Sequence, residues 1–121
     1  MEEYDDLTLG PKQDGSLNLS YNDWQDMPHE LYQMYRDRLL SLNLSNNRLF
    51  RVSNHIEKLT LLKELNVSHN RIETIDLAIG KCIRLRKLDV SSNFLQCLPL
   101  ELSNCRMLVG YERHCAFPSS M

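Results

Sequence analysis

The chain has 121 residues, of which 42% are hydrophobic and 25% charged, and this composition is typical of one globular domain. Its 14 basic and 16 acidic residues give a formal net charge of -2, which argues against a protein whose main task is nonspecific nucleic-acid binding. There is no run of about 18 apolar residues, so we expect no transmembrane helix. The acidic start, Glu2-Glu3-Tyr4-Asp5-Asp6, is unlike a secretion signal, so we expect an intracellular, cytoplasmic protein with reduced cysteines.

The charge is distributed unevenly along the chain. Residues 1–40 contain nine acids and three bases, a net charge of -6, whereas residues 41–90 contain five acids and nine bases, a net charge of +4. Residues 91–121 contain two of each, which completes the total of -2. We therefore expect an acidic N-terminal end and a basic middle.

Residues 1–13 precede any repeated pattern, and we expect them to form an acidic N-terminal tail or cap. A first strand is predicted at Leu17 and Leu19, where apolar and polar residues alternate. A helix is predicted over residues 28–39, because Pro28 suits the first helical position. The apolar stripe of this helix consists of Leu31, Met34, Tyr35 and Leu39.

From residue 39 onward, one pattern repeats with a period of 23 residues. Its first full copy reads Leu39-Leu40-Ser41-Leu42-Asn43-Leu44-Ser45-Asn46-Asn47-Arg48-Leu49. The matching residues of the next two copies are Leu62, Leu65, Val67, Asn70 and Ile72, then Leu85, Leu88, Val90, Asn93 and Leu95. A less complete copy lies 25 residues before the first, with Leu17, Leu19, Asn22 and Trp24.

The second half of each unit repeats as well. Its apolar columns are Val52, Ile75 and Leu98; Ile56, Ile79 and Leu102; and Leu59, Cys82 and Cys105. After Ser53, a suitable N-cap, about two turns of helix are expected. At residues 78–82 a 3₁₀ or irregular turn is predicted instead, because Gly80 interrupts the segment.

This pattern resembles the leucine-rich repeat family in its intracellular 23-residue form, over roughly residues 14–112. The resemblance implies an α/β fold, a short right-handed solenoid with a parallel concave β-sheet and short helices or turns on the convex side. The alternation in Leu42-Asn43-Leu44 agrees, because it points leucine inward and asparagine outward. We assign residues 14–107 to about four repeats and residues 108–121 to a degenerate repeat or C-terminal cap. The alternative for this end is an interface that docks onto another chain.

One asparagine recurs in each unit where the strand ends: Asn22, Asn47, Asn70 and Asn93. At this point the chain bends and leaves the sheet, so its backbone groups lose their strand partners. A buried side-chain amide both donates and accepts, and it can satisfy those groups. We therefore expect a structural role for this ladder.

The sequence contains no recognisable catalytic constellation and no Gly-rich phosphate loop. Cys82 and Cys105 occupy an apolar column, where cysteine acts as a small hydrophobic residue, whereas Cys97 is expected on an exposed loop. A metal set of Cys97, Cys105 and His114-Cys115 lacks the paired short spacing of structural zinc sites. We expect no enzyme activity, no cofactor and no metal site.

The concave face and its borders contain the candidate binding residues. A curved array of side chains on a rigid backbone is the surface that solenoids present to partners. Beside it, the residue after the ladder asparagine is Arg71 in one unit and Phe94 in the next, and both residue types are enriched in interface hot spots. The candidate protein-binding residues are Asn43, Glu64, Asn66, His69, Arg71, Arg86, Lys87, Asp89 and Phe94.

These features favour a non-catalytic protein–protein interaction module, an adaptor or subunit of a larger assembly, that binds through the concave face and the adjacent loop edge. One alternative is an RNA-associated subunit of a ribonucleoprotein that uses the basic residues Arg71, Arg84, Arg86 and Lys87. The net charge and the few exposed aromatic residues speak against it. The other alternative is a structural fragment of a longer repeat array. No membrane association is expected.

Overall fold

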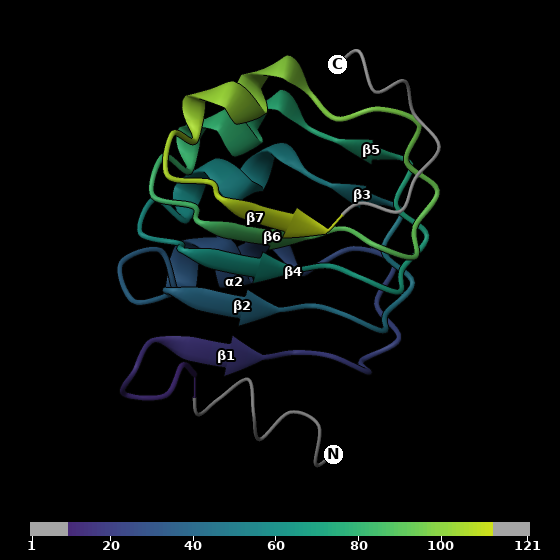
Figure 1. The fold of residues 1–121 in the computed structure, drawn as a ribbon. Coiled ribbons are helices and arrows are strands. Elements are labelled where there is room, and N and C mark those ends of the chain that lie inside the picture. Colours follow the sequence, from purple (N-terminus) through teal and green to yellow (C-terminus); the bar gives the residue numbers. More distant parts are fainter. Residues whose placement is uncertain (1–9, 113–121) are drawn as a thin grey trace.

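The computed structural model describes residues 10–112 of the chain, and of residues 110–112 it describes the backbone only. Five short strands form one sheet: β1 (Ser16–Asn18), β2 (Ser41–Asn43), β4 (Glu64–Asn66), β6 (Lys87–Asp89) and β7 (Gly110–Glu112). They lie in the order β1-β2-β4-β6-β7 and are parallel throughout (Figure 1). Each turn of the chain therefore adds one strand beside the previous one, as the period predicts.

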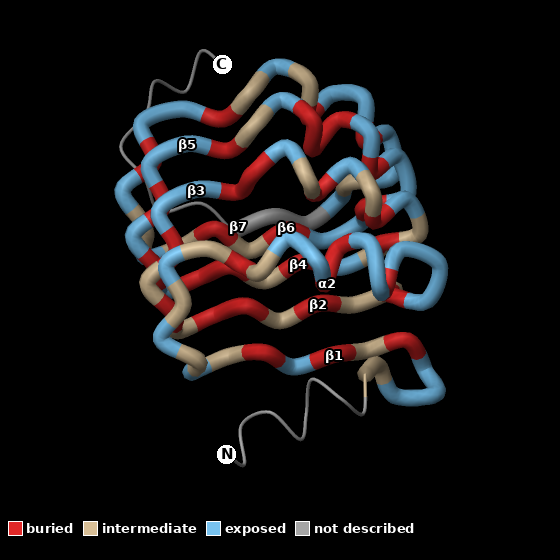
Figure 2. Tube along the Cα trace, turned by 180° about the vertical axis from the view of Figure 1, so that it is seen from behind, coloured by how far each residue is buried: buried red, intermediate tan, exposed pale blue. Residues whose placement is uncertain are grey.

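The middle residue of each strand points into the core. Leu17, Leu42, Leu65 and Leu88 are partners in register, and each is at most 6% exposed. The outward residues on either side of them are exposed or half-buried. Buried residues recur at matching places in successive turns (Figure 2), because a single repeat cannot bury its apolar side alone.

The opposite side of the solenoid consists of short helices and one small sheet. The helices are α2 (His29–Met34) and the 3₁₀-helices η1 (Asn54–Lys58), η2 (Leu77–Lys81) and η3 (Leu100–Asn104). Strands β3 (Arg51–Val52) and β5 (Thr74–Ile75) pair in parallel just before η1 and η2. The described part of the chain contains no helix with the length and apolar character needed to cross a membrane.

The prediction for these segments was partly correct. Ser53 is the N-cap of η1, and its hydroxyl accepts a hydrogen bond from His55 N at 3.4 Å. The predicted 3₁₀ turn around Gly80 is η2. The segment after Ser53, however, is a 3₁₀-helix of five residues rather than two turns of α-helix.

The helix predicted over residues 28–39 is shorter than expected, because α2 ends at Met34. Pro28 is its N-cap and not its first helical residue. Met34 is 56% exposed, and Tyr32, which is 3% exposed, faces the core in its place. Residues after Met34 form turns, which bring Tyr35 and Leu39 into the core without continuing the helix.

The asparagine ladder has the structural role predicted for it. Asn47 Oδ1 accepts from the backbone N–H groups of Asn22 and Trp24 at 2.8 and 3.2 Å, and its Nδ2 donates to the carbonyls of Leu19 and Leu44 at 3.1 and 2.9 Å. Asn70 and Asn93 join two successive repeats in the same way, whereas Asn22 Nδ2 donates to the carbonyl of Leu19 within its own repeat at 2.9 Å. Asn47 and Asn70 are buried, whereas Asn22 and Asn93 at the ends of the ladder are half-buried.

At the C-terminal side, β7 continues the sheet with Tyr111 in register with Leu88. Residues 113–121 lie outside the described residues, and the role of residues 108–121 as a cap, a degenerate repeat or an interface stays a proposal. Residues 1–9 also lie outside the described residues, so the same applies to the predicted N-terminal tail or cap.

Gly80 is required by a close approach between η2 and η3. A Cβ atom at Gly80 would lie 2.8 Å from the carbonyl oxygen of Glu101, closer than van der Waals contact allows. We expect Gly80→Ala to lower the free energy of unfolding by about 1–3 kcal/mol, because a backbone shift must accommodate the added methyl group. Urea unfolding measures this effect, with Lys81→Ala at the exposed end of the same helix as the control. An unchanged midpoint for Gly80→Ala would contradict the packing described.

Candidate functional site

The concave face of the sheet is hollowed into a groove of ≈ 470 Å³. Strands β2, β4 and β6 line it, with their central leucines as the floor. Five of the predicted binding residues border this groove: Asn43, Glu64, Asn66, Lys87 and Asp89. The structure thus brings these five together over three neighbouring repeats.

The side chains of the third strand residue are held by local hydrogen bonds. Asn66 Oδ1 accepts from the backbone N–H and the hydroxyl of Ser68 at 2.9 and 2.7 Å. Asp89 Oδ1 accepts in the same way from Ser91 at 3.0 and 2.7 Å. Such Asx turns fix the side chain against its own backbone. The Asn/Asp-x-Ser triplet, which recurs in four repeats, is the sequence signal for these turns.

The first strand residue forms a second polar column in the groove. Ser41, Glu64 and Lys87 are partners in register, and the Ser41 hydroxyl lies 3.5 Å from Glu64 Oε1 as a long hydrogen bond. Negative and positive side chains therefore occupy adjacent strands at the same level. The groove therefore presents both signs of charge.

His69 lies where the chain leaves β4 and is exposed, but it does not line the groove. Its φ of 56° is left-handed, as are those of Tyr21, Asn46 and Ser92 at the equivalent position of other repeats. The His69 N–H donates to the carbonyl of Ser91 at 3.1 Å, which holds this bend against the next repeat. His69 is thus part of the rim at which the strands end.

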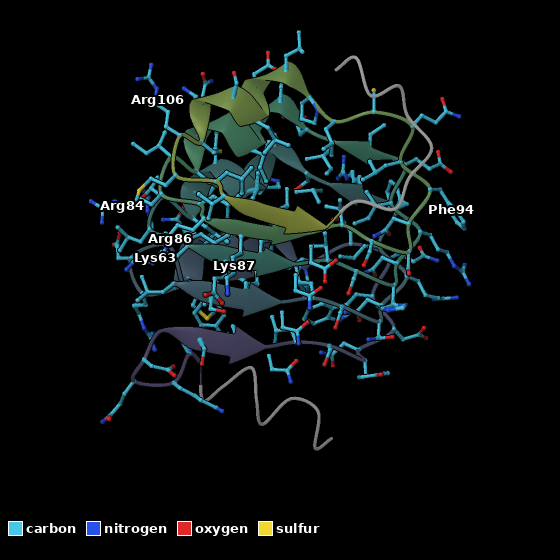
Figure 3. The ribbon with its side chains drawn as sticks, in the orientation of Figure 1. Lys63, Arg84, Arg86, Lys87, Phe94 and Arg106 are labelled. Atoms are coloured by element: carbon cyan, nitrogen blue, oxygen red, sulfur yellow. The ribbon has the colours of Figure 1, made fainter. Side chains whose placement is uncertain are left out.

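Arg71 and Phe94 lie on exposed loops of adjacent repeats on the same side as this rim. The Phe94 N–H donates to the carbonyl of Ile72, the residue after Arg71, at 2.9 Å. Phe94 is 62% exposed (Figure 3). The residues equivalent to Arg71 in the two preceding repeats are Arg48 and Asp23, and they form an ion pair with Arg48 Nε 2.8 Å from Asp23 Oδ1. The Nε–H of Arg48 is not aligned for a hydrogen bond. Arg71 makes no ion pair with any described residue.

Arg86 lies apart from the rim, on the turn that leads into β6. Figure 3 shows Arg86 and Phe94 at opposite sides of the sheet. The nine predicted residues therefore do not form one patch, since the groove separates Arg86 on one border from His69, Arg71 and Phe94 on the other. Strand β6 runs between residues 86 and 94, which explains their separation.

The described cysteines do not form a reactive site. Cys82 is fully buried, and its Sγ lies 3.3 Å from the carbonyl oxygen of Ile56. Burial raises the pKa of the Cys82 thiol to about 12 and also raises the pKa of Cys105, so both stay protonated at neutral pH. Cys97 is exposed as predicted. Among residues 10–112, no group of three His, Cys, Asp or Glu side chains is placed to hold a metal; Cys115 and His114 lie outside that range.

Two histidines form a ring-stacking contact that was not predicted from the sequence. His29 of α2 and His55 of η1 stack with ring centroids 5.4 Å apart, and Tyr32 stacks on His55 at 5.8 Å. The two histidines are 26 residues apart in the sequence, and the greater length of the first unit obscures their register. Because the contact lies on the helical side, it does not take part in the groove.

Each repeat of the sequence forms one turn of an α/β solenoid, with a parallel sheet on one side and short helices on the other. The model of the family Leucine Rich repeats (2 copies) matches residues 60–104. The 23-residue period and the fold agree with this match to leucine-rich repeats.

Among solved structures, a leucine-rich repeat protein of Leptospira interrogans is similar, with a TM-score of 0.69 and 23% sequence identity. The match covers 87% of this chain and 32% of the other, so the chain spans about a third of that protein's length. A search of curated proteins gave no significant match.

Proposed function

We propose that this leucine-rich repeat protein is a non-catalytic, intracellular and cytoplasmic interaction module, an adaptor or subunit of a larger assembly. Leucine-rich repeat domains generally act as binding modules. We infer that a protein partner binds through the concave groove together with the loop edge that carries Arg71 and Phe94.

The observation that carries this proposal is the fixed polar lining of the groove. The side-chain oxygens of Asn43 and Asn66 are held in Asx turns, whereas their Nδ2 groups make no hydrogen bond to another described residue. Two donors thus border the groove of ≈ 470 Å³, whose lining also includes Glu64 and Lys87. Preorganised polar groups lose little entropy on binding, which favours a specific ligand.

The size of the sheet supports the participation of the loop edge. Five strands about 4.8 Å apart span only about 20 Å, whereas a standard interface buries about 800 Å² on each partner. The concave face alone barely reaches this area. Phe94 is exposed beside the groove's rim, and an aromatic residue next to an arginine is a typical hot-spot pair.

A variant that removes only the donors tests this proposal. In Asn43→Asp/Asn66→Asp the Asx turns persist, because Asp89 makes the same turn one repeat later. The matched control is Asn54→Asp/Asn104→Asp, which makes the same change at exposed positions of η1 and η3. The full chain serves as bait in cells, and a partner that is recovered stoichiometrically is purified for calorimetry.

We expect the groove variant to weaken this partner's binding about tenfold or more, since it loses two hydrogen bonds and gains repulsion, and the control to stay within about twofold. Equal losses in both variants would contradict the groove as the binding site. Recovery of RNA in place of a protein, with affinity that falls steeply as salt rises, would favour the ribonucleoprotein alternative.

A further inference from the structure

A second surface lies on the turns that lead into the strands, at the border of the sheet opposite Phe94. The turns at residues 60–63, 83–86 and 106–109 stack on one another through backbone hydrogen bonds. Arg86 N–H donates to the carbonyl of Lys63 at 2.7 Å, and Val109 N–H donates to that of Arg86 at 3.1 Å. We call these three segments the basic turns.

The basic turns carry four cations and no acid: Lys63, Arg84, Arg86 and Arg106. Figure 3 shows these side chains along one border of the sheet, with Lys87 of β6 beside them. The equivalent turn of the preceding repeat, at residues 37–40, differs because Asp37 and Arg38 balance each other. The positive charge is therefore specific to these three turns and is not a general feature of the repeat.

The four cations are not neutralised within the described part of the protein. None of them lies within 4.0 Å of a described carboxylate, whereas Arg51 Nη2 lies 2.8 Å from Asp26 Oδ2 on another part of the surface. Turns stacked at the strand spacing of about 4.8 Å place their charges within the Debye length of about 8 Å, so the cations repel one another. A bound anionic group relieves this repulsion.

Exposed apolar side chains lie between these cations. Ile83 is 58% exposed, Met107 53% and Val109 87%. Each turn also has a leucine that packs against the core: Leu62 and Leu85 are buried, and Leu108 is half-buried. These leucines fix the backbone from which the exposed side chains project. The surface thus combines positive charge with apolar contact area in one strip across three repeats.

We propose that the basic turns bind an acidic segment of a partner protein whose carboxylates alternate with apolar side chains. Carboxylates pair with Arg84 and Arg86, and the apolar side chains contact Ile83, Met107 and Val109. RNA fits this surface less well, because the basic turns contain no aromatic residue on which a base can stack. The surface lies outside the groove, so this inference goes beyond the function proposed above.

The test uses the full chain and a fluorescein-labelled peptide of four Glu-Glu-Leu repeats, with fluorescence anisotropy as the readout. Arg84→Gln/Arg86→Gln removes two charges from the basic turns. Lys12→Gln/Arg36→Gln removes two charges from exposed positions elsewhere and is the matched control. We expect the first variant to weaken peptide binding about tenfold and the control to change it by less than about twofold.

Two further peptides and one further variant complete the test. A peptide of four Gln-Gln-Leu repeats is expected not to bind, and four Glu-Glu-Gly repeats are expected to bind several-fold more weakly than Glu-Glu-Leu. Asn43→Ser/Asn66→Ser alters the groove without a change of charge and is expected to leave peptide binding unchanged, which separates this surface from the groove.

The proposal would be overturned if Arg84→Gln/Arg86→Gln and Lys12→Gln/Arg36→Gln weakened binding of the Glu-Glu-Leu peptide equally. It would also be overturned if only Asn43→Ser/Asn66→Ser weakened this binding. Tighter binding of a 12-nucleotide oligouridylate than of the Glu-Glu-Leu peptide, abolished by Arg84→Gln/Arg86→Gln, would overturn it in favour of RNA.

Discussion

Replacement of Asn70 by alanine is expected to lower the free energy of unfolding by about 3 kcal/mol or more. Asn70 is 7% exposed, and its Oδ1 accepts from Leu49 N–H at 3.0 Å. Its Nδ2 lies 3.0 and 2.9 Å from the carbonyls of Leu44 and Val67. The alanine variant leaves the buried Leu49 N–H without this partner, and such a group costs about 1–3 kcal/mol. It also removes one of the hydrogen bonds to each carbonyl, although Leu44 O still accepts from Asn47 Nδ2 and Val67 O from Asn93 Nδ2.

Urea unfolding followed by circular dichroism measures this loss. Asn54→Ala is the control, because Asn54 is exposed at the start of η1 and its replacement is expected to change stability by less than about 0.5 kcal/mol. Similar midpoints for the two variants would show that the asparagine ladder does not hold the repeats together.

Leu65→Ala is the second change with a large expected effect, a loss of about 3–4 kcal/mol. Leu65 is 2% exposed in the central strand β4, between Leu42 and Leu88 of the neighbouring strands. The substitution removes apolar burial and leaves a cavity that the regular backbone cannot close. Since each repeat is stabilised by its neighbours, a loss in the middle of the array weakens the contacts on both sides.

The same urea assay tests this prediction, with Leu77→Ala as its control. Leu77 is 61% exposed on η2, so its truncation is expected to cost less than about 0.5 kcal/mol. A loss for Leu65→Ala as small as that of the control would contradict the assignment of Leu65 to the core.

The strands and the ladder could be predicted because period and side-chain direction determine them together. With a period of 23 residues, Leu42, Leu65 and Leu88 must stack, and the alternation decides which neighbours face outward. The helical side was less predictable. Over five residues, a 3₁₀-helix and a short α-helix bury apolar residues at similar spacings, so the sequence pattern could not distinguish the two kinds of helix. In α2, the choice of Tyr32 over Met34 depends on where the helix ends, which is the least certain feature of such a pattern.

The residues of the candidate site could be predicted from the equivalent positions of successive repeats. These positions alone did not show that the groove, the Phe94 edge and the basic turns are separate surfaces. Arg86 and Phe94 are eight residues apart in one repeat, and β6 between them carries the chain from one border of the sheet to the other. The Asx turns at Asn66 and Asp89 were missed because they depend on the local path after the strand rather than on the period. That no described carboxylate neutralises the basic turns follows only from the stacked geometry.

We propose that a protein partner binds at the concave face and its Phe94 edge. The most direct measurement replaces Phe94 by the photo-crosslinking residue p-benzoylphenylalanine, which keeps an aromatic ring at this exposed position, and irradiates cells that express the chain. The comparison places the same residue at Leu77, which is similarly exposed on η2. We predict a discrete crosslinked protein from position 94 and none from position 77. Crosslinking from position 77 alone, or from neither position, would contradict the claim.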